Sequence, residues 1–346
     1  MNHLGELSNP SCFHSSLDID GFGKDVLISF LKSMMIIRKT EQRLALGRRD
    51  GLIGGPVHLA AGQEAIPVGV SYALRKSDRV FGGHRSHAHL LALNPNFYKL
   101  FAEILGKKTG FSRGMGGSMH LWDQPNGFYG SVPIVAGTVP LAVGAGLSGK
   151  MQAKNNESSD VGVAYLGDGA IEEGVVHESF NLASKFKLPV LFVVENNLFA
   201  SHMHISQRQP SNSICRFANA NYIKNCLVDG NDVVAVANTA QQLISDARQG
   251  KGPGLIEAVT YRWYGHVDWR EDVDVGIERS VNDINEWKAR DPISRLSQAM
   301  KTCNYWSEEQ EQAFEETLDS EISIAWDKAM NDPYPDKSSL KMHVFN

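Results

Sequence analysis

The run DVGVAYLGDGAIEEGVVHESFNLASKFKLPVLFVVENN, residues 160–197, decides the fold. Short apolar runs within 160–169 and 190–197 each end in turn or polar residues, which is typical of buried parallel strands. The stretch between them, 172–187, has the apolar spacing of an amphipathic helix. A third apolar run, at 253–262, follows another helical stretch. Strands alternating with helices predict an α/β fold, a parallel sheet with helices on both faces.

The rest of the chain adds helices and two less regular segments. Further helices are expected at 23–45, 63–74, 96–106, 238–250 and 307–330. Residues 1–20 are expected to form a loose polar arm. Residues 21–346 are expected to form a single domain that ends in a helical extension. The acidic stretch 272–292 has weak periodicity and is expected to be a mobile linker.

Composition excludes several classes of protein. The chain has 346 residues, 42% hydrophobic and 21% charged, with a net charge of -5. This balance is typical of a soluble globular protein and favours neither a nucleic-acid nor a membrane partner. The first twenty residues lack a secretory apolar core, and four scattered cysteines suggest neither disulfides nor a zinc site. We therefore expect a cytoplasmic location with reduced thiols.

One glycine-rich stretch mimics two nucleotide-binding motifs. GAGLSGK, residues 144–150, has the glycine spacing of a dinucleotide fingerprint and of a phosphate loop. Both motifs require a strand before the loop and a helix after it. Here the glycines lie inside an apolar stretch that reads as one helix beginning after Pro140, and Met151 replaces the hydroxyl residue that would bind magnesium. We interpret these small residues as a helix-packing surface.

The ends of two predicted strands carry oxygen ligands. Asp168 ends one strand, and Asn196 and Asn197 end the next. Ligands of open α/β sheets bind beyond the carboxyl ends of the strands. Magnesium takes a few protein oxygens and is completed by water and phosphates. Asp168 and Asn197 therefore predict a magnesium site that holds a diphosphate. The glycines beside Asp168 would allow the backbone to approach the phosphates closely.

The spacing of Gly-Asp-Gly, 26 residues and Asn-Asn resembles the thiamine diphosphate-binding motif. Other stretches extend the resemblance over about residues 25–300: GGPVHLAAGQEAIPVGV, HRSHAHLLA, AEILGKKTGFSRGMGGSMHLWD, GFYGSVPIVAGTVPLAVGAG and YRWYGH. Together they resemble the alpha subunit of the two-subunit first component of 2-oxo acid dehydrogenase complexes. This group includes the pyruvate, branched-chain and acetoin dehydrogenases.

The resemblance implies a metal and diphosphate site. By position, the magnesium ligands would be Asp168, Asn197 and the backbone carbonyl of Phe199. The family usually has tyrosine at the last place, but phenylalanine keeps the carbonyl. Gly169 and Ala170 would contact the diphosphate through their backbone.

The resemblance also assigns further contacts to the cofactor. Arg85 matches the arginine that binds the diphosphate, and its forked donors suit phosphate oxygens. Arg262 and His266 match a second arginine and a histidine near the diphosphate and the thiazolium. Ile134 and Val135 match the segment that holds the aminopyrimidine.

Histidines are the implied catalytic residues. His58 and His87 match histidines at the active-site mouth that hydrogen-bond the 2-oxo substrate and its intermediates, and His266 completes the catalytic set. Histidine suits this work because it titrates near neutral pH. His84 and His89 are close in sequence to His87, and we expect them to be structural or to support the site from behind.

The family's chemistry implies cofactors and partners. Thiamine diphosphate and Mg²⁺ would be the cofactors of an oxidoreductase that decarboxylates a 2-oxo acid and passes the acyl group to a lipoyl disulfide. The glutamate that assists the aminopyrimidine belongs to a beta subunit in relatives, and Glu64, Glu172 and Glu173 do not match it. The resemblance therefore implies two alpha and two beta chains, with a lipoyl-bearing acyltransferase as a further partner.

Several positions depart from the family pattern. Tyr264 and Val267 replace family residues in the YGHV stretch, and 268–276 replaces a serine-rich segment. Val267 removes a serine that is phosphorylated in mitochondrial relatives. Pro133 stands where glycine is usual and should stiffen the cofactor-contacting turn. Three alternatives stay open: a thiamine diphosphate-dependent carboligase or decarboxylase with a non-lipoyl acceptor, a non-catalytic homologue, and a nucleotide-binding protein.

Overall fold

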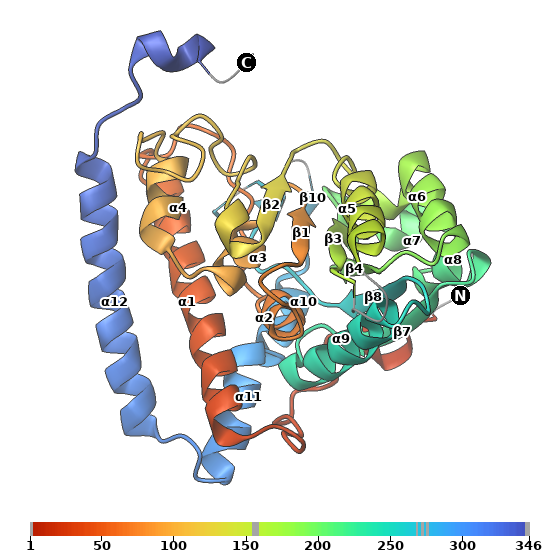
Figure 1. The fold of residues 1–346 in the computed structure, drawn as a ribbon. Helices are drawn as coiled ribbons and strands as arrows, with labels where there is room; N and C mark the ends of the chain where they lie inside the picture. The colour runs from red at the N-terminus through yellow and green to blue at the C-terminus, as the bar shows by residue number, and fades with distance from the viewer. Residues whose placement is uncertain (1–2, 154–158, 268, 271–272, 275–276, 343–346) are drawn as a thin grey trace.

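The protein is built on one parallel sheet. The computed structural model describes residues 3–153, 159–267, 269–270, 273–274 and 277–342. Within these residues six strands form the sheet in the order β2-β1-β3-β4-β8-β7, with every neighbouring pair parallel (Figure 1). The strands are β1 (Arg79–Gly82), β2 (Phe128–Ser131), β3 (Gly162–Gly167), β4 (Val190–Asn196), β7 (Lys224–Asp229) and β8 (Gly254–Val259).

Helices and two short hairpins surround this sheet. The helices are α1 (Lys24–Arg49), α2 (Ala65–Tyr72), α3 (His87–Leu93), α4 (Phe97–Ile104), α5 (Val139–Gln152), α6 (Gly174–Lys185), α7 (Ile205–Arg208), α8 (Cys215–Ala220), α9 (Val233–Arg248), α10 (Val281–Ala289), α11 (Pro292–Thr302) and α12 (Glu308–Asn331). The hairpins pair β5 (Phe199–Ala200) with β6 (Met203–His204) and β9 (Val273–Asp274) with β10 (Ile277–Glu278).

Each face of the sheet packs on its own hydrophobic core. Along β4, Leu191 and Val193 join the core beneath α1, α2 and α9, whereas Phe192 and Val194 join the core beneath α5 and α6. The alternation follows because successive strand side chains point to opposite faces, and all these side chains are buried. The predicted α/β fold with helices on both faces is confirmed.

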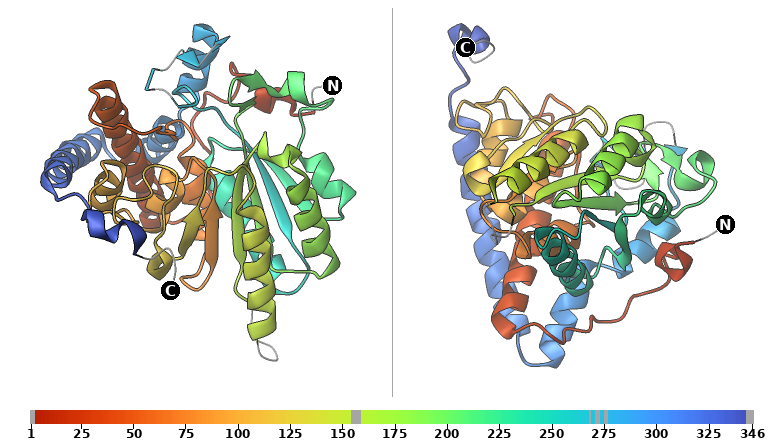
Figure 2. Two further views of the ribbon diagram at one scale, coloured as in Figure 1. Left: turned by 90° about the horizontal axis from the view of Figure 1, so that it is seen from above. Right: turned by 45° about the vertical axis from the view of Figure 1, so that its right-hand side comes forward.

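The terminal helices close one side of the molecule. In both views of Figure 2, the red α1 and the blue α12 lie side by side. Trp326 of α12 packs edge-on against Phe101 of α4, with ring centroids 5.2 Å apart. A Cβ at Gly47 of α1 would lie 2.4 Å from the Trp326 ring. Glycine at this position therefore allows the close approach of the two helices.

The elements predicted for the core are present, and the sequence missed several others. The helices predicted at 23–45, 63–74, 96–106, 238–250 and 307–330 are confirmed by α1, α2, α4, α9 and α12. The short strands β1, β2 and β7 were not predicted, because their runs are short or mixed in polarity. The division into an arm and one domain stays a prediction.

Two segments expected to be loose are packed against the body. In the N-terminal arm, Leu4 and Leu17 are buried, and Leu7 accepts a hydrogen bond from Arg290 through its carbonyl (2.9 Å). In the expected linker, α10 buries Trp287, which stacks on Tyr261 at 5.3 Å. The expectation of a mobile linker is wrong for α10, because a few large apolar residues suffice to dock a short helix. Parts of 268–276 lie outside the described residues.

The glycines of 144–150 lie within α5, as predicted. A Cβ at Gly146 would lie 2.6 Å from Val190, and one at Gly149 would lie 2.4 Å from the Asp160 carbonyl oxygen. These residues allow α5 to pack closely on the sheet. The nucleotide-binding interpretation is therefore not supported.

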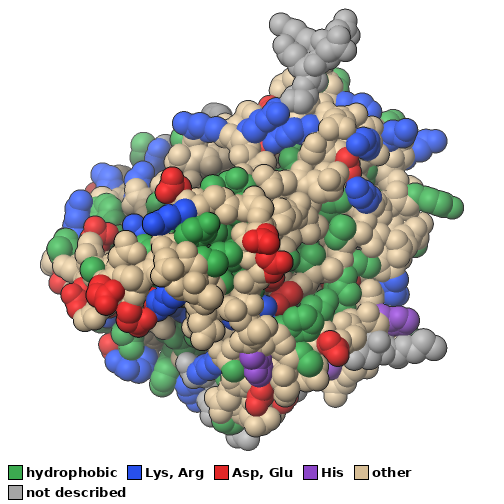
Figure 3. All heavy atoms as spheres, turned by 90° about the horizontal axis from the view of Figure 1, so that it is seen from below, with side chains coloured by type: hydrophobic (Ala, Val, Ile, Leu, Met, Phe, Trp, Pro, Cys, Tyr) green, Lys and Arg blue, Asp and Glu red, His purple; other side chains and the backbone are tan. Residues whose placement is uncertain are grey.

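The surface carries mixed charge. The face drawn in Figure 3 shows lysines and arginines interspersed with acidic side chains and apolar patches. No helix among the described residues is long and apolar enough to span a bilayer. The cytoplasmic location stays a prediction.

Candidate active site

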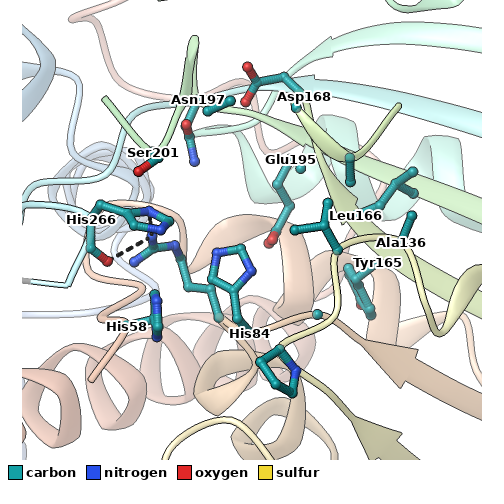
Figure 4. Close-up of a pocket in the computed structure, with 18 of the residues that line it drawn as sticks. His58, His84, Ala136, Tyr165, Leu166, Asp168, Glu195, Asn197, Ser201 and His266 are labelled. Atoms are coloured by element: carbon teal, nitrogen blue, oxygen red, sulfur yellow. Dashed lines mark hydrogen bonds between the residues drawn. The ribbon is translucent and has the colours of Figure 1, made fainter. Parts of the chain in front are cut away.

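A cavity of about 380 Å³ opens at the carboxyl ends of β1, β3 and β4. Strands β3 and β4 are paired, with Gly167 opposite Glu195, so the turns that follow them are neighbours. Most of the predicted site residues line the cavity: His58, Arg85, Val135, Asp168, Gly169, Ala170, Asn197, Phe199 and His266. Figure 4 shows Asp168 with Asn197 at one end and His58, His84 and His266 grouped at the other. These are called the oxygen end and the histidine end below.

Asp168 is buried at the oxygen end beside the Arg208 guanidinium, a partner that was not predicted from the sequence. Burial raises the pKa of its carboxyl to about 6, although the neighbouring Arg208 guanidinium acts to lower it. Arg208 forms an ion pair with Asp168 and another with Glu172. The Asp168 carbonyl accepts a hydrogen bond from the Gln209 side-chain amide at 3.3 Å. Asp168 is thus neutralised by a side chain 40 residues away in sequence.

The amide of Asn197 is held in a fixed orientation. Its Nδ2 donates to Gln63 Oε1 at 3.1 Å, and its Oδ1 accepts from the backbone N–H of Phe199 at 3.2 Å. The amide oxygen therefore lies on the side of the Phe199 turn. Gln63 is buried, and its Nε2 has no hydrogen-bond partner within the described part of the chain. No role was predicted for Gln63, because only the fold brings residues 63 and 197 together.

Gly169 forms the floor of the oxygen end. A Cβ added there would lie 2.4 Å from the Ala200 Cβ. Any side chain would therefore push the turn after β3 away from the β5–β6 hairpin. Glycine leaves backbone exposed to the cavity, as a ligand with phosphate oxygens requires.

Two buried guanidiniums lie near the cavity. Arg85 donates to the Leu59 carbonyl at 2.6 Å and to the His266 carbonyl at 3.2 Å, and it lies 3.3 Å from His266 Nδ1. Arg262 donates to the carbonyls of Tyr264 and Ser201, each at 2.8 Å. Arg85 lines the cavity, whereas Arg262 is buried and is not among the lining residues.

Three imidazoles meet at the histidine end. Ring centroids are 4.7 Å apart for His58 and His84, 5.1 Å for His58 and His266, and 5.3 Å for His84 and His266. Burial, followed by the charge of Arg85, lowers the pKa of all three, to about 3 for His84 and about 2 for His266. The three rings are therefore neutral at neutral pH, and each can donate one hydrogen bond and accept another.

His87 does not line the cavity. It begins α3 with a side chain that is 0% exposed, between the Glu41 carboxylate (3.1 Å from Nδ1) and the Ser118 hydroxyl (2.8 Å from Nε2). His84, which was expected to be structural or to support the site from behind, lines the cavity instead. His84 lies in the loop that follows β1 and borders the cavity, whereas His87 begins α3 and its side chain is buried in the core. The catalytic role predicted for His87 stays a prediction.

A contact between His89 and Glu195 was also not predicted from the sequence. His89 Nε2 lies 3.0 Å from Glu195 Oε1, and its ring stacks on Tyr165 at 3.8 Å. His89, Glu195 and Tyr165 all line the cavity. Glu195 immediately precedes the two asparagines, so its position at a strand end was the available signal.

The rim of the cavity is apolar and exposed. Ile134 is 71% exposed and Val135 is 44% exposed, and Val135 lines the cavity. Leu141, near the start of α5, is also exposed. Adjacent exposed apolar side chains are typical of a surface that contacts another protein.

Comparisons with known proteins agree with this arrangement. Residues 32–338 match the dehydrogenase E1 component family. The chain belongs to the dehydrogenase E1 component family. The family predicted from the sequence is thus confirmed, and with it an oxidoreductase component that depends on thiamine diphosphate.

Relatives of known name cover almost the whole chain. The alpha subunit of the pyruvate dehydrogenase E1 component from Rhizobium meliloti is 33% identical over 92% of this chain and 90% of its own. The mitochondrial counterpart from Dictyostelium discoideum is 35% identical over 93% of this chain and 83% of its own. The alpha subunit of acetoin:2,6-dichlorophenolindophenol oxidoreductase from Bacillus subtilis is 35% identical over 91% of this chain and 92% of its own. This E1 chain therefore resembles pyruvate-type and acetoin-type relatives at similar identity.

Proposed function

We propose that this E1 chain is the alpha subunit of a 2-oxo acid or acetoin dehydrogenase, which it forms with a beta subunit. One observation carries the proposal. The oxygen end, the buried Arg85 and the neutral histidines converge on a single cavity at the carboxyl ends of the parallel strands. A diphosphate with its cation and a small carbonyl substrate require these different donors.

The residues at the oxygen end fit Mg²⁺ and the cofactor diphosphate. Asp168, the Asn197 amide oxygen and the Phe199 carbonyl would supply the hard oxygen ligands that Mg²⁺ prefers. The backbone of Gly169 and Ala170 would face the phosphates, because a Cβ at Gly169 has no room. When bound, thiamine diphosphate would supply the carbon nucleophile and the electron sink.

The arginines and histidines would position charge and protons. Arg85 lies close enough to His266 to hold it by hydrogen bonds to both its ring and its carbonyl, and its charge favours phosphate oxygens. His58, His84 and His266, kept neutral by burial, would donate hydrogen bonds to a substrate oxygen or accept them from a substrate hydroxyl.

The partner subunit would cover the exposed apolar rim. Ile134 and Val135 stand beside the cavity, where a beta subunit could complete the cofactor site and bury them. Glu195 lines the cavity but is bound to His89, so the glutamate that assists the aminopyrimidine is proposed to come from the beta subunit. We propose two alpha and two beta chains, and a lipoyl-bearing acyltransferase as the acceptor of the acyl group.

Turnover by the co-purified alpha and beta chains tests the proposal. A panel of 2-oxo acids and acetoin should reduce 2,6-dichlorophenolindophenol only when thiamine diphosphate and Mg²⁺ are present. The alpha chain alone should bind the cofactor weakly and not turn over. Cofactor-dependent product formation without reduction of dye or lipoyl domain would favour a carboligase or decarboxylase with another acceptor. Cofactor-independent activity would reject the proposal.

A further inference from the structure

The last residue of the short helix α7 brings a positively charged side chain into contact with Asp168, the proposed metal ligand. This residue, Arg208, has a side chain that is only 7% exposed. It forms ion pairs with Asp168 and Glu172 and donates from Nε to the Met203 carbonyl at 3.1 Å. The ion pair therefore occupies Asp168 Oδ2 at the edge of the proposed metal site.

The next residue, Gln209, adds hydrogen bonds to the same two acidic residues. The Gln209 amide donates to Glu172 Oε1 at 2.8 Å and to the Asp168 carbonyl at 3.3 Å. The Gln209 oxygen in turn accepts from Arg216 at 3.1 Å. Two consecutive side chains thus attach residues 203–209 to the Gly-Asp-Gly turn.

A divalent cation on Asp168 would meet the guanidinium of Arg208 within a buried site. Like charges a few ångströms apart repel strongly where solvent is excluded. Both cations compete for one carboxylate that is 1% exposed. Binding of the metal is therefore opposed by the ion pair.

We propose that Arg208 is an internal counter-ion of Asp168 that the metal must displace, so that Arg208 sets the affinity for Mg²⁺ and diphosphate. Binding of the metal then breaks the ion pair between Arg208 and Asp168. This inference rests on the proposed function, since it takes the cation to be the one that carries the cofactor.

Glu172 gives the displaced guanidinium a place to remain. Its side chain is 35% exposed, whereas that of Asp168 is 1% exposed. Arg208 can therefore keep its outer ion pair while leaving the inner one. The guanidinium therefore stays paired after the exchange, which the metal and the diphosphate together would drive.

Equilibrium binding to the alpha–beta complex tests the proposal. Mg²⁺ is titrated calorimetrically at saturating thiamine diphosphate, and Mn²⁺ binding is followed by electron paramagnetic resonance. Arg208→Gln should bind either cation about tenfold more tightly, within the roughly 5–150-fold range of coupled sites. Arg208→Lys, which keeps the charge, should change affinity less.

Arg216→Gln is the matched control, because Arg216 donates to the Gln209 oxygen and, among the described residues, forms no ion pair with Asp168. The cation affinity of this variant should stay near that of the unaltered protein. Unchanged or weaker cation binding by Arg208→Gln would overturn the proposal, since weaker binding would make Arg208 a ligand of the diphosphate. Failure of the proposed function appears separately: in that case the unaltered complex would bind thiamine diphosphate equally well in EDTA.

Discussion

The two ends of the cavity solve the same electrostatic problem in opposite ways. At the oxygen end, burial raises the pKa of Asp168 to about 6, and the charge is compensated by Arg208. At the histidine end, burial and nearby arginines lower the pKa of His84 to about 3, and the charge is absent. A buried site can therefore hold a charge by pairing it or remove it by shifting its pKa. The first end is suited to exchange of cations, and the second to hydrogen bonds with neutral rings.

Loss of the oxygen-end carboxylate should have the largest effect. Asp168→Ala should weaken Mg²⁺-dependent binding of thiamine diphosphate by more than about 100-fold, because changes to outer partners of a metal site alone cost about 10–100-fold. Titration of the alpha–beta complex by calorimetry measures this. Asp319→Ala, on the exposed side of α12 and paired with Lys39, is the control and should leave affinity within about twofold. Unchanged affinity for Asp168→Ala would remove the metal assignment.

His87 and His58 should separate structure from chemistry. His87→Ala leaves the buried Glu41 without its imidazole partner and should lower the free energy of unfolding by about 2 kcal/mol. His58→Ala should cost less stability, because Nδ1 of His58 has no hydrogen-bond partner among the described residues, but it should lower turnover. Urea unfolding and steady-state kinetics measure the two. A His87→Ala protein of normal stability and no turnover would restore His87 to the catalytic set.

Gln63 should affect the oxygen end through Asn197. Gln63→Ala frees the Asn197 amide to rotate and should weaken Mg²⁺ binding by about tenfold. Gln63→Glu keeps an acceptor for Asn197 Nδ2 and should restore part of the affinity. Gln124→Ala, at an exposed position, is the control. Equal affinity for all three variants would show that Asn197 does not need this orientation.

The pH dependence of stability should differ in sign between the two ends. Between about pH 6.5 and 3, His84 is protonated in the unfolded chain but stays neutral in the folded chain. The contribution of neutral His84 to stability is therefore present above about pH 6.5 and is lost as pH falls toward about 3. Asp168 acts oppositely: its contribution is present at low pH and is lost as pH rises through about 6. Three histidines outweigh one aspartate, so the metal-free chain should lose stability between about pH 7.5 and 5.5.

Variants separate these contributions in urea unfolding at the two pH values. His84→Gln should reduce the loss on acidification, and Asp168→Asn should enlarge it. If both variants and the unaltered chain lost the same stability on acidification, the electrostatic difference between the two ends would be disproved.

The central strands and the strand-end residues were predictable from local pattern. The apolar runs before Asp168 and Asn197 are long enough to be recognised as buried strands, and parallel pairing then places their ends together. The helix around 144–150 was predictable because its glycines lie within a continuous apolar stretch. The edge strands β2 and β7 and the docked α10 were not, because their stability comes from neighbours distant in sequence.

The sequence by itself determined the central strands β3, β4 and β8 and the chemical inventory of the site: the carboxylate, the paired asparagines, the arginines and the histidines. Only the tertiary structure decided which of them meet. It brought His84 rather than His87 into the cavity, joined Gln63 to Asn197 across 134 residues, and set Arg208 on Asp168. The physical reason is that local periodicity fixes which face a side chain occupies, whereas contacts between distant segments depend on how packed layers close around a shared cavity.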